Sequence, residues 1–202
     1  SGFVRFLAPG GDAHQLSRAL PWRSLVFARQ KLVLVAELGG LDPADRLGPV
    51  LEALERHAGA AAGGALPFGS LVVEHPDSDA ARPLAALARA FGNALRPALR
   101  RTGLLAPQER AARPRLHVCL LAGDHLLLAT AAPGDASPWP MGVPRLRLHR
   151  DAPSRSALKL EEAFLTLLDY GERARWLRPG LSAADLGAAP GGWTWVLQRA
   201  GL

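Results

Sequence analysis

A glycine-rich segment near the carboxyl end of the chain, residues 185–193, constrains the fold more than any other feature. It reads Asp-Leu-Gly-Ala-Ala-Pro-Gly-Gly-Trp and overlaps the end of the apolar run Leu181–Leu186. The run predicts a short buried strand, and Trp193–Ala200 has the pattern of a helix. The segment therefore spans the end of a strand, a tight loop and the start of a helix. Such a junction directs backbone N–H groups and the positive end of a helix dipole toward a ligand.

The spacing of the glycines narrows the class of ligand. No Lys-Ser/Thr pair follows Gly191 and Gly192, so the segment is not the phosphate loop of kinases and ATPases. Its spacing also departs from the Gly-x-Gly-x-x-Gly pattern of dinucleotide-binding proteins. Asp185, at the carboxyl end of the predicted strand, suits a positively charged ligand such as S-adenosylmethionine. An ordinary strand-to-helix turn would also account for a bare Gly-Gly pair.

The patterning of the rest of the chain predicts two parts joined by a stiff connector. Residues 1–132 have the pattern of an α+β unit, and residues 133–153 are rich in proline, which favours an extended connector and a domain boundary. The expected strands are 2–7, 24–38, 70–74, 117–121 and 126–130, and the expected helices are 12–20, 42–57, 83–101 with an interruption at 91–93, and 157–168. Asp12 and Asp42 are the expected helix caps. Residues 154–202 form the second part.

Composition restricts the class of protein. Hydrophobic residues make up 49% and charged residues 21% of the 202 positions, as in globular proteins. Every apolar stretch is far shorter than the ~20 residues of a membrane-spanning helix, so no membrane partner is expected. The single cysteine, Cys119, cannot form an internal disulfide and fits a reducing cytoplasm. The six histidines lack ligand spacing, so we expect no metal site.

The balance of charge points to a polyanionic partner. The formal net charge is +6 and the sequence pI is about 10.8. The clustered arginines are interpreted in two ways. Together they would bind the phosphates of an RNA backbone, whereas any single one of them is explained equally well as part of a solvated, arginine-rich face. These arginines are Arg82, Arg89, Arg96, Arg100, Arg101, Arg110, Arg113 and Arg115. Lysine occurs only at Lys31 and Lys159, and Lys31 is expected to be a surface or strand-edge charge.

Two segments carry a resemblance to a known family. One is the glycine-rich segment 185–193, and the other is residues 154–163, Ser-Arg-Ser-Ala-Leu-Lys-Leu-Glu-Glu-Ala. Together they resemble the FtsJ-like ribose 2′-O-methyltransferases of RNA. Joined to residues 137–146, and with further similarity at 24–30 and 96–100, they are most similar to those members that methylate a cytidine 2′-hydroxyl in large-subunit ribosomal RNA.

The resemblance implies both a fold and a cofactor. Residues 1–132 would hold a ferredoxin-like part and a THUMP domain that bind RNA, and residues 154–202 would begin an α/β Rossmann-like methyltransferase domain. The cofactor would be S-adenosylmethionine. Its contacts, carried over by position, are Ser156, Asp185, Gly187, Ala189, Pro190, Gly191, Gly192 and Trp193. Ser156 is equally suited to cap a helix, and Trp193 to anchor helix packing.

By the same resemblance, Lys159 is the first lysine of a catalytic Lys-Asp-Lys-Glu tetrad. A ribose hydroxyl is a poor nucleophile until it loses its proton, and a nearby ammonium group favours the alkoxide. Ser156 precedes Lys159 by three residues, so both project from one side of a helix. A solvated lysine paired with Glu161 or Glu162 is the alternative. The rest of the tetrad would lie beyond residue 202, so residues 1–202 alone are expected neither to methylate RNA nor to bind the cofactor well.

Two alternatives to the methyltransferase hypothesis remain open. A non-catalytic RNA-binding module with a degenerate methyltransferase domain is the main alternative. A nicotinamide-dependent oxidoreductase ranks below both, because it requires a different glycine spacing and leaves residues 156–159 unexplained. The chain starts at Ser1-Gly2 without methionine and stops at Leu202 soon after a helix begins. We therefore expect an internal piece of a longer cytoplasmic protein, with a monomer favoured.

Overall fold

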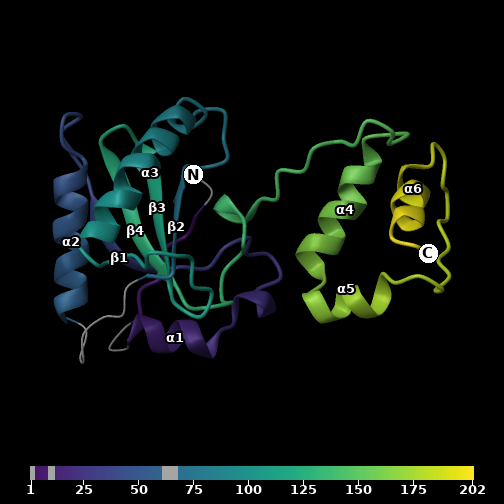
Figure 1. Cartoon of the computed structure of the whole chain (residues 1–202), viewed down its shortest axis with the longest axis horizontal. Coiled ribbons are helices and arrows are strands. Elements are labelled where there is room, and N and C mark those ends of the chain that lie inside the picture. The colour runs from purple at the N-terminus through teal and green to yellow at the C-terminus, as the bar shows by residue number, and fades with distance from the viewer. Residues whose placement is uncertain (1–2, 9–11, 61–67) are drawn as a thin grey trace. The chain divides into compact units, whose positions relative to one another are not determined.

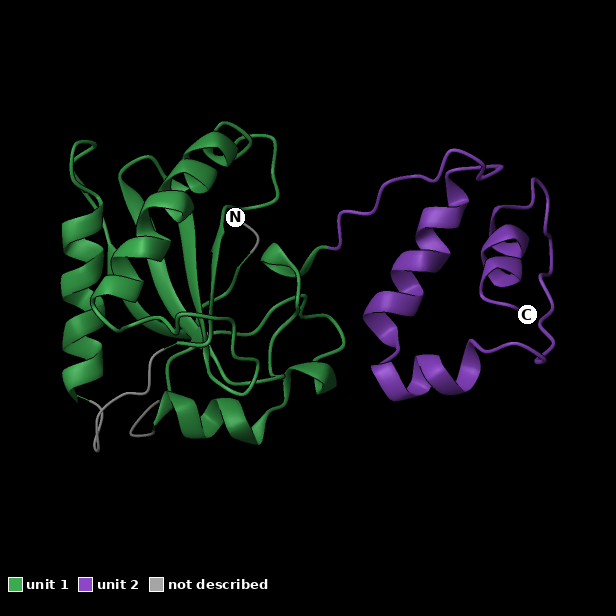
Figure 2. Ribbon diagram, viewed as in Figure 1, with its two compact units in different colours: residues 1–143 green, residues 144–202 purple. Residues whose placement is uncertain are grey.

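The computed structural model describes residues 3–8, 12–60 and 68–202. The chain divides into two compact units, Ser1–Val143 and Pro144–Leu202 (Figure 2). We call them unit 1 and unit 2. The division falls inside the proline-rich segment 133–153.

A four-stranded mixed sheet forms the centre of unit 1 (Figure 1). Its strands are β1 (Val33–Leu38), β2 (Ser70–Glu74), β3 (Arg115–Ala122) and β4 (His125–Ala131), in the order β1-β4-β3-β2. β4 is antiparallel to both β1 and β3, whereas β2 and β3 are parallel. The expected strand at 70–74 and the expected hairpin of 117–121 with 126–130 are confirmed. Unit 1 is therefore an α+β structure.

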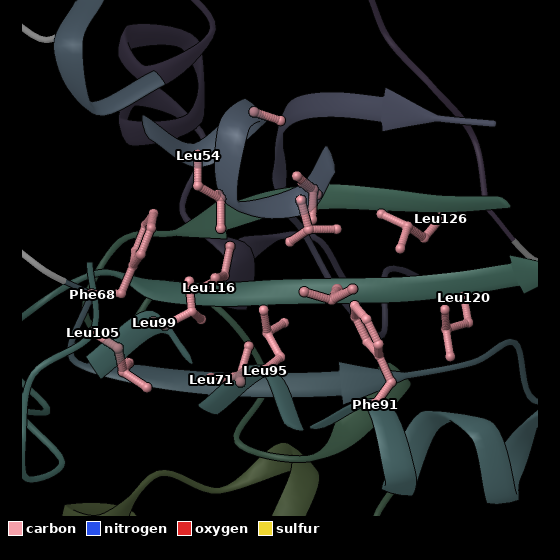
Figure 3. Close-up of a cluster of buried hydrophobic side chains, with 14 of the residues drawn as sticks. Leu54, Phe68, Leu71, Phe91, Leu95, Leu99, Leu105, Leu116, Leu120 and Leu126 are labelled. Atoms are coloured by element: carbon pink, nitrogen blue, oxygen red, sulfur yellow. The ribbon is translucent and has the colours of Figure 1, made fainter. Parts of the chain in front are cut away.

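Two helices cover one face of this sheet and form the core with it. They are α2 (Leu47–Ala60) and α3 (Leu84–Arg101). Side chains alternate between the two faces of a strand, so Leu116, Val118 and Leu120 of β3 share the helix-covered face. They pack in one buried cluster with Leu54 of α2 and Leu95 of α3 (Figure 3). Burying each such side chain contributes about 1.5–3 kcal/mol.

The opposite face of the sheet carries polar side chains. By the same alternation, Arg115, His117 and Cys119 of β3 point to this face. On the neighbouring strand β2, Ser70 pairs in register with Arg115, and Glu74 pairs with Cys119. Burying such groups is costly unless each one is hydrogen-bonded. Glu74 and His117 pair with each other on the sheet, whereas Glu74 and Arg115 also bond to the segment that follows β4.

The start of the chain differs from the sequence-based expectation. Residues 3–7 form no strand, and Gly2 lies outside the described residues. α1 (Ala13–Ala19) begins after Asp12 as expected, with the Asp12 side chain accepting from His14 N–H. β1 begins at Val33 rather than at residue 24, because β4 pairs Val33 with Thr130 and ends one residue later. Residues 24–32 therefore have no strand to pair with, and the ferredoxin-like arrangement stays a prediction.

Two helices also differ from their expected limits. α2 begins at Leu47, because Asp42 instead closes a turn by accepting from Ala44 N–H at 2.8 Å. α3 is continuous through residues 91–93. Its Gly92 is explained by packing, since a Cβ there would lie 3.3 Å from a Val73 methyl group of β2.

Unit 2 consists of helices and loops. Its helices are α4 (Ser156–Leu167), α5 (Tyr170–Trp176) and α6 (Gly192–Arg199). The expected strand at Leu181–Leu186 is wrong: no strand forms within residues 144–202, and Leu186 is 94% exposed. A strand needs a neighbour to satisfy its backbone hydrogen bonds, and unit 2 supplies none. α5 was not expected, and it begins at a capping box between Asp169 and Glu172.

Candidate functional site

The glycine-rich segment forms an exposed loop that leads into α6. Gly187 has φ +79° and Gly191 has φ +90°, a region in which only glycine is unstrained. Gly191 N–H donates to the Ala188 carbonyl oxygen, and the Ala189–Pro190 peptide bond is cis. Residues 186–190 are all exposed. The loop backbone is therefore open to solvent immediately before a helix N-terminus.

Gly192 brings α6 against the start of α4. A Cβ on this residue would lie 2.2 Å from Ser156 Oγ and 2.4 Å from Ser154 Oγ. Those distances are far inside van der Waals contact. The missing side chain of Gly192 thus serves first the contact between the two helices.

Ser156 and Trp193 meet at the same contact. The Trp193 indole N–H donates to the Ser156 carbonyl oxygen at 3.1 Å, and Ser156 Oγ lies 2.6 Å from Ser154 Oγ. The position that caps α4 is taken by Arg155, which makes no side-chain capping bond. Ser156 therefore acts here as a packing and hydrogen-bonding partner of α6.

Asp185 is joined to the first turn of α6. Thr194 Oγ1 donates to Asp185 Oδ2 at 2.7 Å. A carboxylate at this place is favoured by the helix dipole, and it ties the two ends of the loop together. Thr194 was missed by the sequence reasoning, although a hydroxyl in the first turn of a predicted helix is a usable signal.

Lys159 lies one turn along α4 from Ser156, and its side chain is exposed. In the part of the chain that the structure describes, no ion pair or hydrogen bond holds its ammonium group, and the alternative pairing with Glu161 or Glu162 is not formed. The structure thus brings Ser156, Gly192 and Trp193 into contact and leaves the Lys159 ammonium open to solvent.

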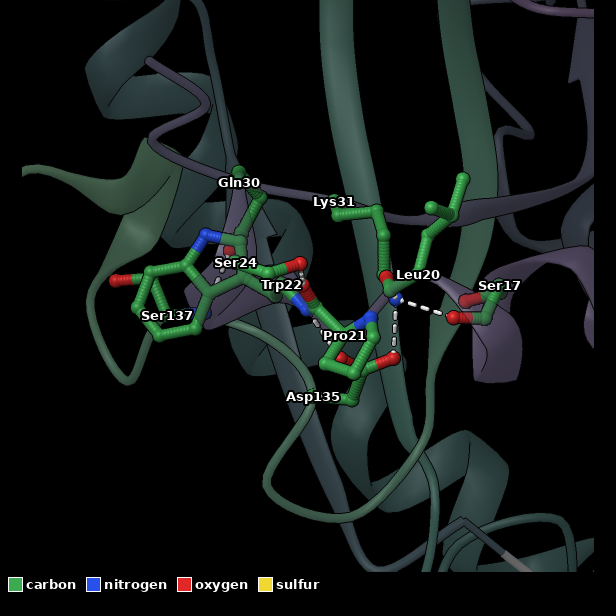
Figure 4. A network of polar contacts seen from close by, with 9 residues as sticks. All are labelled: Ser17, Leu20, Pro21, Trp22, Ser24, Gln30, Lys31, Asp135 and Ser137. Atoms are coloured by element: carbon green, nitrogen blue, oxygen red, sulfur yellow. Dashed lines mark hydrogen bonds and ion pairs between the residues drawn. The ribbon is translucent and has the colours of Figure 1, made fainter. Parts of the chain in front are cut away.

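Lys31 is not the surface or strand-edge charge that was expected (Figure 4). Its Nζ donates to the carbonyl oxygens of Ser17 at 2.7 Å and Leu20 at 2.6 Å, and it also pairs with Asp135 Oδ2. Its side chain is only 15% exposed. A cation is favourable at the carboxyl end of α1, and Asp135 also accepts from Trp22 N–H at 2.7 Å. Local sequence gives no signal for a pair 104 positions apart.

A buried pair on the polar face of the sheet holds the segment after β4. Glu74 Oε1 lies 2.9 Å from His117 Nδ1, and both side chains are 1% exposed. Glu74 Oε2 accepts from the Met141 backbone N–H. Among the described residues, His117 Nε2 has no hydrogen-bond partner. Sequence reasoning missed this network, whose one local signal is a charged residue at the end of an apolar strand.

Residues 137–142 are fixed at two further points. Ser137 N–H donates to the Gln30 side-chain oxygen at 2.8 Å, and the Ser137 carbonyl accepts from Arg115 Nη1 at 2.7 Å. Gly142 has φ +68°, and a Cβ there would lie 2.1 Å from the Arg29 carbonyl oxygen. The first part of the predicted connector is therefore packed into unit 1.

The expected arginine track is only partly available for RNA. Arg115 donates to Ser137, and Arg96 Nη2 donates to the Leu71 carbonyl oxygen at 3.3 Å. Arg82 pairs with Asp79 at 2.5 Å on the surface. The remaining exposed members are Arg89, Arg100, Arg101 and Arg110, whereas Arg113 is partly buried.

The described side chains form neither a metal site nor a membrane-spanning helix, and they include a thiol with a raised pKa. Within the described ranges, no group of His, Cys, Asp and Glu is arranged to hold a metal ion, and none of the helices there combines the length and apolarity of a membrane span. Burial, followed by the nearby Glu74 charge, raises the pKa of the Cys119 thiol to about 12. Cys119 is therefore a core residue and not a reactive thiol.

The chain is similar to known proteins over nearly its whole length. Residues 45–131 match the family model "Ribosomal RNA large subunit methyltransferase M, N-terminal". Proteins named ribosomal RNA large subunit methyltransferase M from Xanthomonas oryzae pv. oryzae (strain PXO99A) and Xanthomonas campestris pv. campestris (strain B100) are each 60% identical over 198 residues. The protein of that name from Xanthomonas euvesicatoria pv. vesicatoria (strain 85-10) is 59% identical over 198 residues.

In each case the match covers 98% of this chain and 54% of the relative. The chain thus spans about half the length of the curated relatives it matches. The matched family segment runs from just before α2 to the end of β4. The chain is therefore similar over nearly its whole length to proteins named ribosomal RNA large subunit methyltransferase M, and its residues 45–131 match the amino-terminal model of that family.

Proposed function

We propose that the protein takes part in the S-adenosylmethionine-dependent 2′-O-methylation of a cytidine in large-subunit ribosomal RNA. The names of its relatives support methylation of that RNA. The resemblance of residues 154–163 and 185–193 supports the ribose as acceptor. The observation that carries the proposal is the contact of Gly192 with Ser156, by which α6 packs against α4. The exposed glycine-rich loop leads into α6, and Lys159 lies on α4.

The residues of the loop fit a cofactor of this kind. The exposed backbone of residues 186–190 and the positive φ of Gly187 and Gly191 leave N–H and carbonyl groups within reach of a ligand. The Asp185 carboxylate is suited to a cationic amino group. The contacts proposed are Asp185, Gly187, Ala189, Pro190 and Gly191, with Ser156, Gly192 and Trp193 shaping the same site. The bound cofactor supplies a methyl group on a sulfonium.

Lys159 is proposed to act on the ribose. An ammonium group beside a 2′-hydroxyl lowers the pKa of that hydroxyl by charge attraction and favours its alkoxide. Lysine suits this task because its compact ammonium group approaches one oxygen, whereas the guanidinium of arginine is a wide planar fork. The exposed and unpaired ammonium of Lys159 in the described structure is compatible with this role.

Unit 1 is proposed to bind RNA as a THUMP-containing region, and unit 2 to begin a Rossmann-like methyltransferase domain. The exposed guanidinium groups of Arg89, Arg100, Arg101 and Arg110 are the proposed phosphate contacts. We place the protein in the cytoplasm as a monomer without a metal. Because unit 2 offers no sheet to support the loop, residues 1–202 alone are expected to show no methyl transfer.

The test compares the intact protein with three variants at α4. Wild type, Lys159→Ala, Lys159→Arg and the control Glu162→Ala are incubated with labelled S-adenosylmethionine and unmodified ribosomal RNA. Label in alkali-resistant dinucleotides reports ribose methylation. We expect label with the wild type and with Glu162→Ala, and a loss of at least about 100-fold in both lysine variants.

Two outcomes would contradict the proposal. Label that is released by alkali as single nucleotides would place the methyl group on a base and refute the ribose as acceptor. Absence of label from the wild type, with RNA binding retained, would favour the non-catalytic RNA-binding module.

A further inference from the structure

A hydrogen-bonded turn in unit 1 displays two apolar side chains to solvent. Phe27 is 100% exposed and Val26 is 85% exposed. They lie at the tip of the turn Ser24–Ala28, which begins at the last residue of the short 3-10 helix Trp22–Ser24. A large aromatic ring left fully in water forgoes about 1.5–3 kcal/mol of burial, so its place at the tip of a turn calls for an explanation.

The turn has a fixed conformation. Leu25 N–H donates to the Trp22 carbonyl at 3.0 Å, and Ala28 N–H donates to the Leu25 carbonyl at 2.9 Å. The Trp22 indole N–H then donates to the Ala28 carbonyl at 3.1 Å and closes the turn from the side. The Phe27 side chain therefore projects from a preorganised backbone, which reduces the entropy lost on binding.

The turn is also joined to the last part of unit 1. Gln30 accepts from Ser137 N–H, and the Arg29 carbonyl faces Gly142 so closely that no Cβ fits between them. Gly142 immediately precedes Val143, where unit 1 ends. Phe27 thus belongs to the same packed piece from which the chain continues toward α4.

The charge around the turn selects the kind of partner. Arg23 and Arg29 flank the turn and are exposed, and Arg23 lies 5.7 Å from the centre of the Trp22 ring. Residues 21–31 contain no acidic residue, and the nearby Asp135 is already bound to Lys31 and Trp22. Phe27 is thus an exposed aromatic residue with an exposed arginine on either side of it in the sequence, and proteins bind unpaired bases and their phosphates with aromatic and arginine side chains.

We propose that the turn Ser24–Ala28 is an RNA contact, in which the Phe27 ring stacks on an unpaired base and Arg23 and Arg29 bind the adjacent phosphates. The proposal rests on the proposed function for RNA as the partner. A protein partner is disfavoured, because covering Phe27 with an apolar protein surface would also desolvate two cations that have no acidic neighbour in the turn.

The experiment uses the intact protein and measures binding of fluorescein-labelled oligouridylate and of a fully paired RNA duplex. Phe27→Ala is expected to weaken oligouridylate binding about 5- to 100-fold and to leave duplex binding within about twofold. Phe27→Trp keeps a stacking surface and should restore binding. Arg29→Gln should reduce the salt dependence of binding by about one phosphate contact. Phe6→Ala is the matched control, since Phe6 is also an exposed aromatic residue of unit 1.

Several results would overturn the inference. Unchanged oligouridylate binding by Phe27→Ala would do so, as would an equal loss in Phe6→Ala. A change in sedimentation or in unfolding temperature without a change in RNA affinity would identify the turn as a protein contact.

Methyl transfer separates this inference from the proposed function. If ribosomal RNA is methylated, Phe27→Ala should raise KM for that RNA and leave kcat nearly unchanged, which a loss of fold would not do. Methylation with an unaltered KM in Phe27→Ala would refute the turn as an RNA contact and leave the proposed function standing. Absence of methylation by the wild type would refute the proposed function, and the oligouridylate titration would still decide the role of Phe27.

Discussion

Replacing Glu74 with alanine is expected to destabilise unit 1 by about 3–5 kcal/mol. The Glu74 carboxylate accepts from His117 Nδ1 at 2.9 Å and from Met141 N–H. The side chains of Glu74 and His117 are each 1% exposed. Removal of the carboxylate leaves a buried imidazole and a backbone amide without partners, and each unsatisfied group costs about 1–3 kcal/mol. The two losses together amount to about 2–6 kcal/mol, which includes the expected range.

Urea unfolding at neutral pH measures the loss, and hydrogen exchange at the Met141 amide locates it. The chain contains a matched control in Glu37, whose carboxylate also has two partners, Arg5 at 2.8 Å and His125 at 2.9 Å. Because the Glu37 side chain is 38% exposed, water can replace both partners, and Glu37→Ala should change stability little.

The stability loss of Glu74→Gln should fall between those of Glu74→Ala and Glu37→Ala, because glutamine keeps the side-chain volume and one acceptor oxygen. A loss in Glu74→Ala no larger than that in Glu37→Ala would refute the reasoning, because burial would then add nothing to the strength of the pair. Slow exchange of the Met141 amide in Glu74→Ala would show that other contacts hold residues 137–142 in place.

Three further predictions follow from single residues. Gly192→Ala should destabilise the contact of α6 with α4 by about 1–3 kcal/mol, because its Cβ meets Ser156 Oγ at 2.2 Å; adding Ser156→Ala should recover part of the urea stability. Cys119, with its pKa raised to about 12, should react with a thiol reagent at about pH 8 only after unfolding, and stability should fall above about pH 9, where the unfolded thiol ionises first. Partial burial, and then the charge of His14, lower the pKa of His57 below 6.5, so the free energy of unfolding should decrease as the pH falls through 6.5, and His57→Gln should flatten that slope.

The parts of the fold that sequence predicted are those with local determinants. β2 follows from a short apolar run, the β3–β4 hairpin follows from two apolar runs around a turn, and α1 follows from Asp12 as its cap. The failures at residues 24–32 and 181–186 share one cause. Both segments have strand-like composition, but neither has a neighbouring strand to pair with, and pairing is not a local property.

In the candidate site, too, the contacts that sequence predicted are those with local determinants. The contact of Ser156 with α6 joins two segments that the sequence had already singled out, because their residue types and spacing are distinctive. The roles of Lys31, Glu74 and His117 depend on partners from distant parts of the chain. A charged residue inside or beside an apolar strand indicates that some partner exists, but does not identify it.

The structure also shows what segments 24–30 and 137–143 contribute to unit 1, although they carry no obvious chemistry. Gln30 and Ser137 hydrogen-bond to each other, and Arg29 packs against Gly142, so these positions serve the packing of unit 1. Phe27 lies within the same segment, yet its ring is fully exposed and contributes nothing to that packing. A role in maintaining the fold therefore explains its neighbours but not Phe27, and binding of an unpaired base is the explanation that its charged surroundings favour.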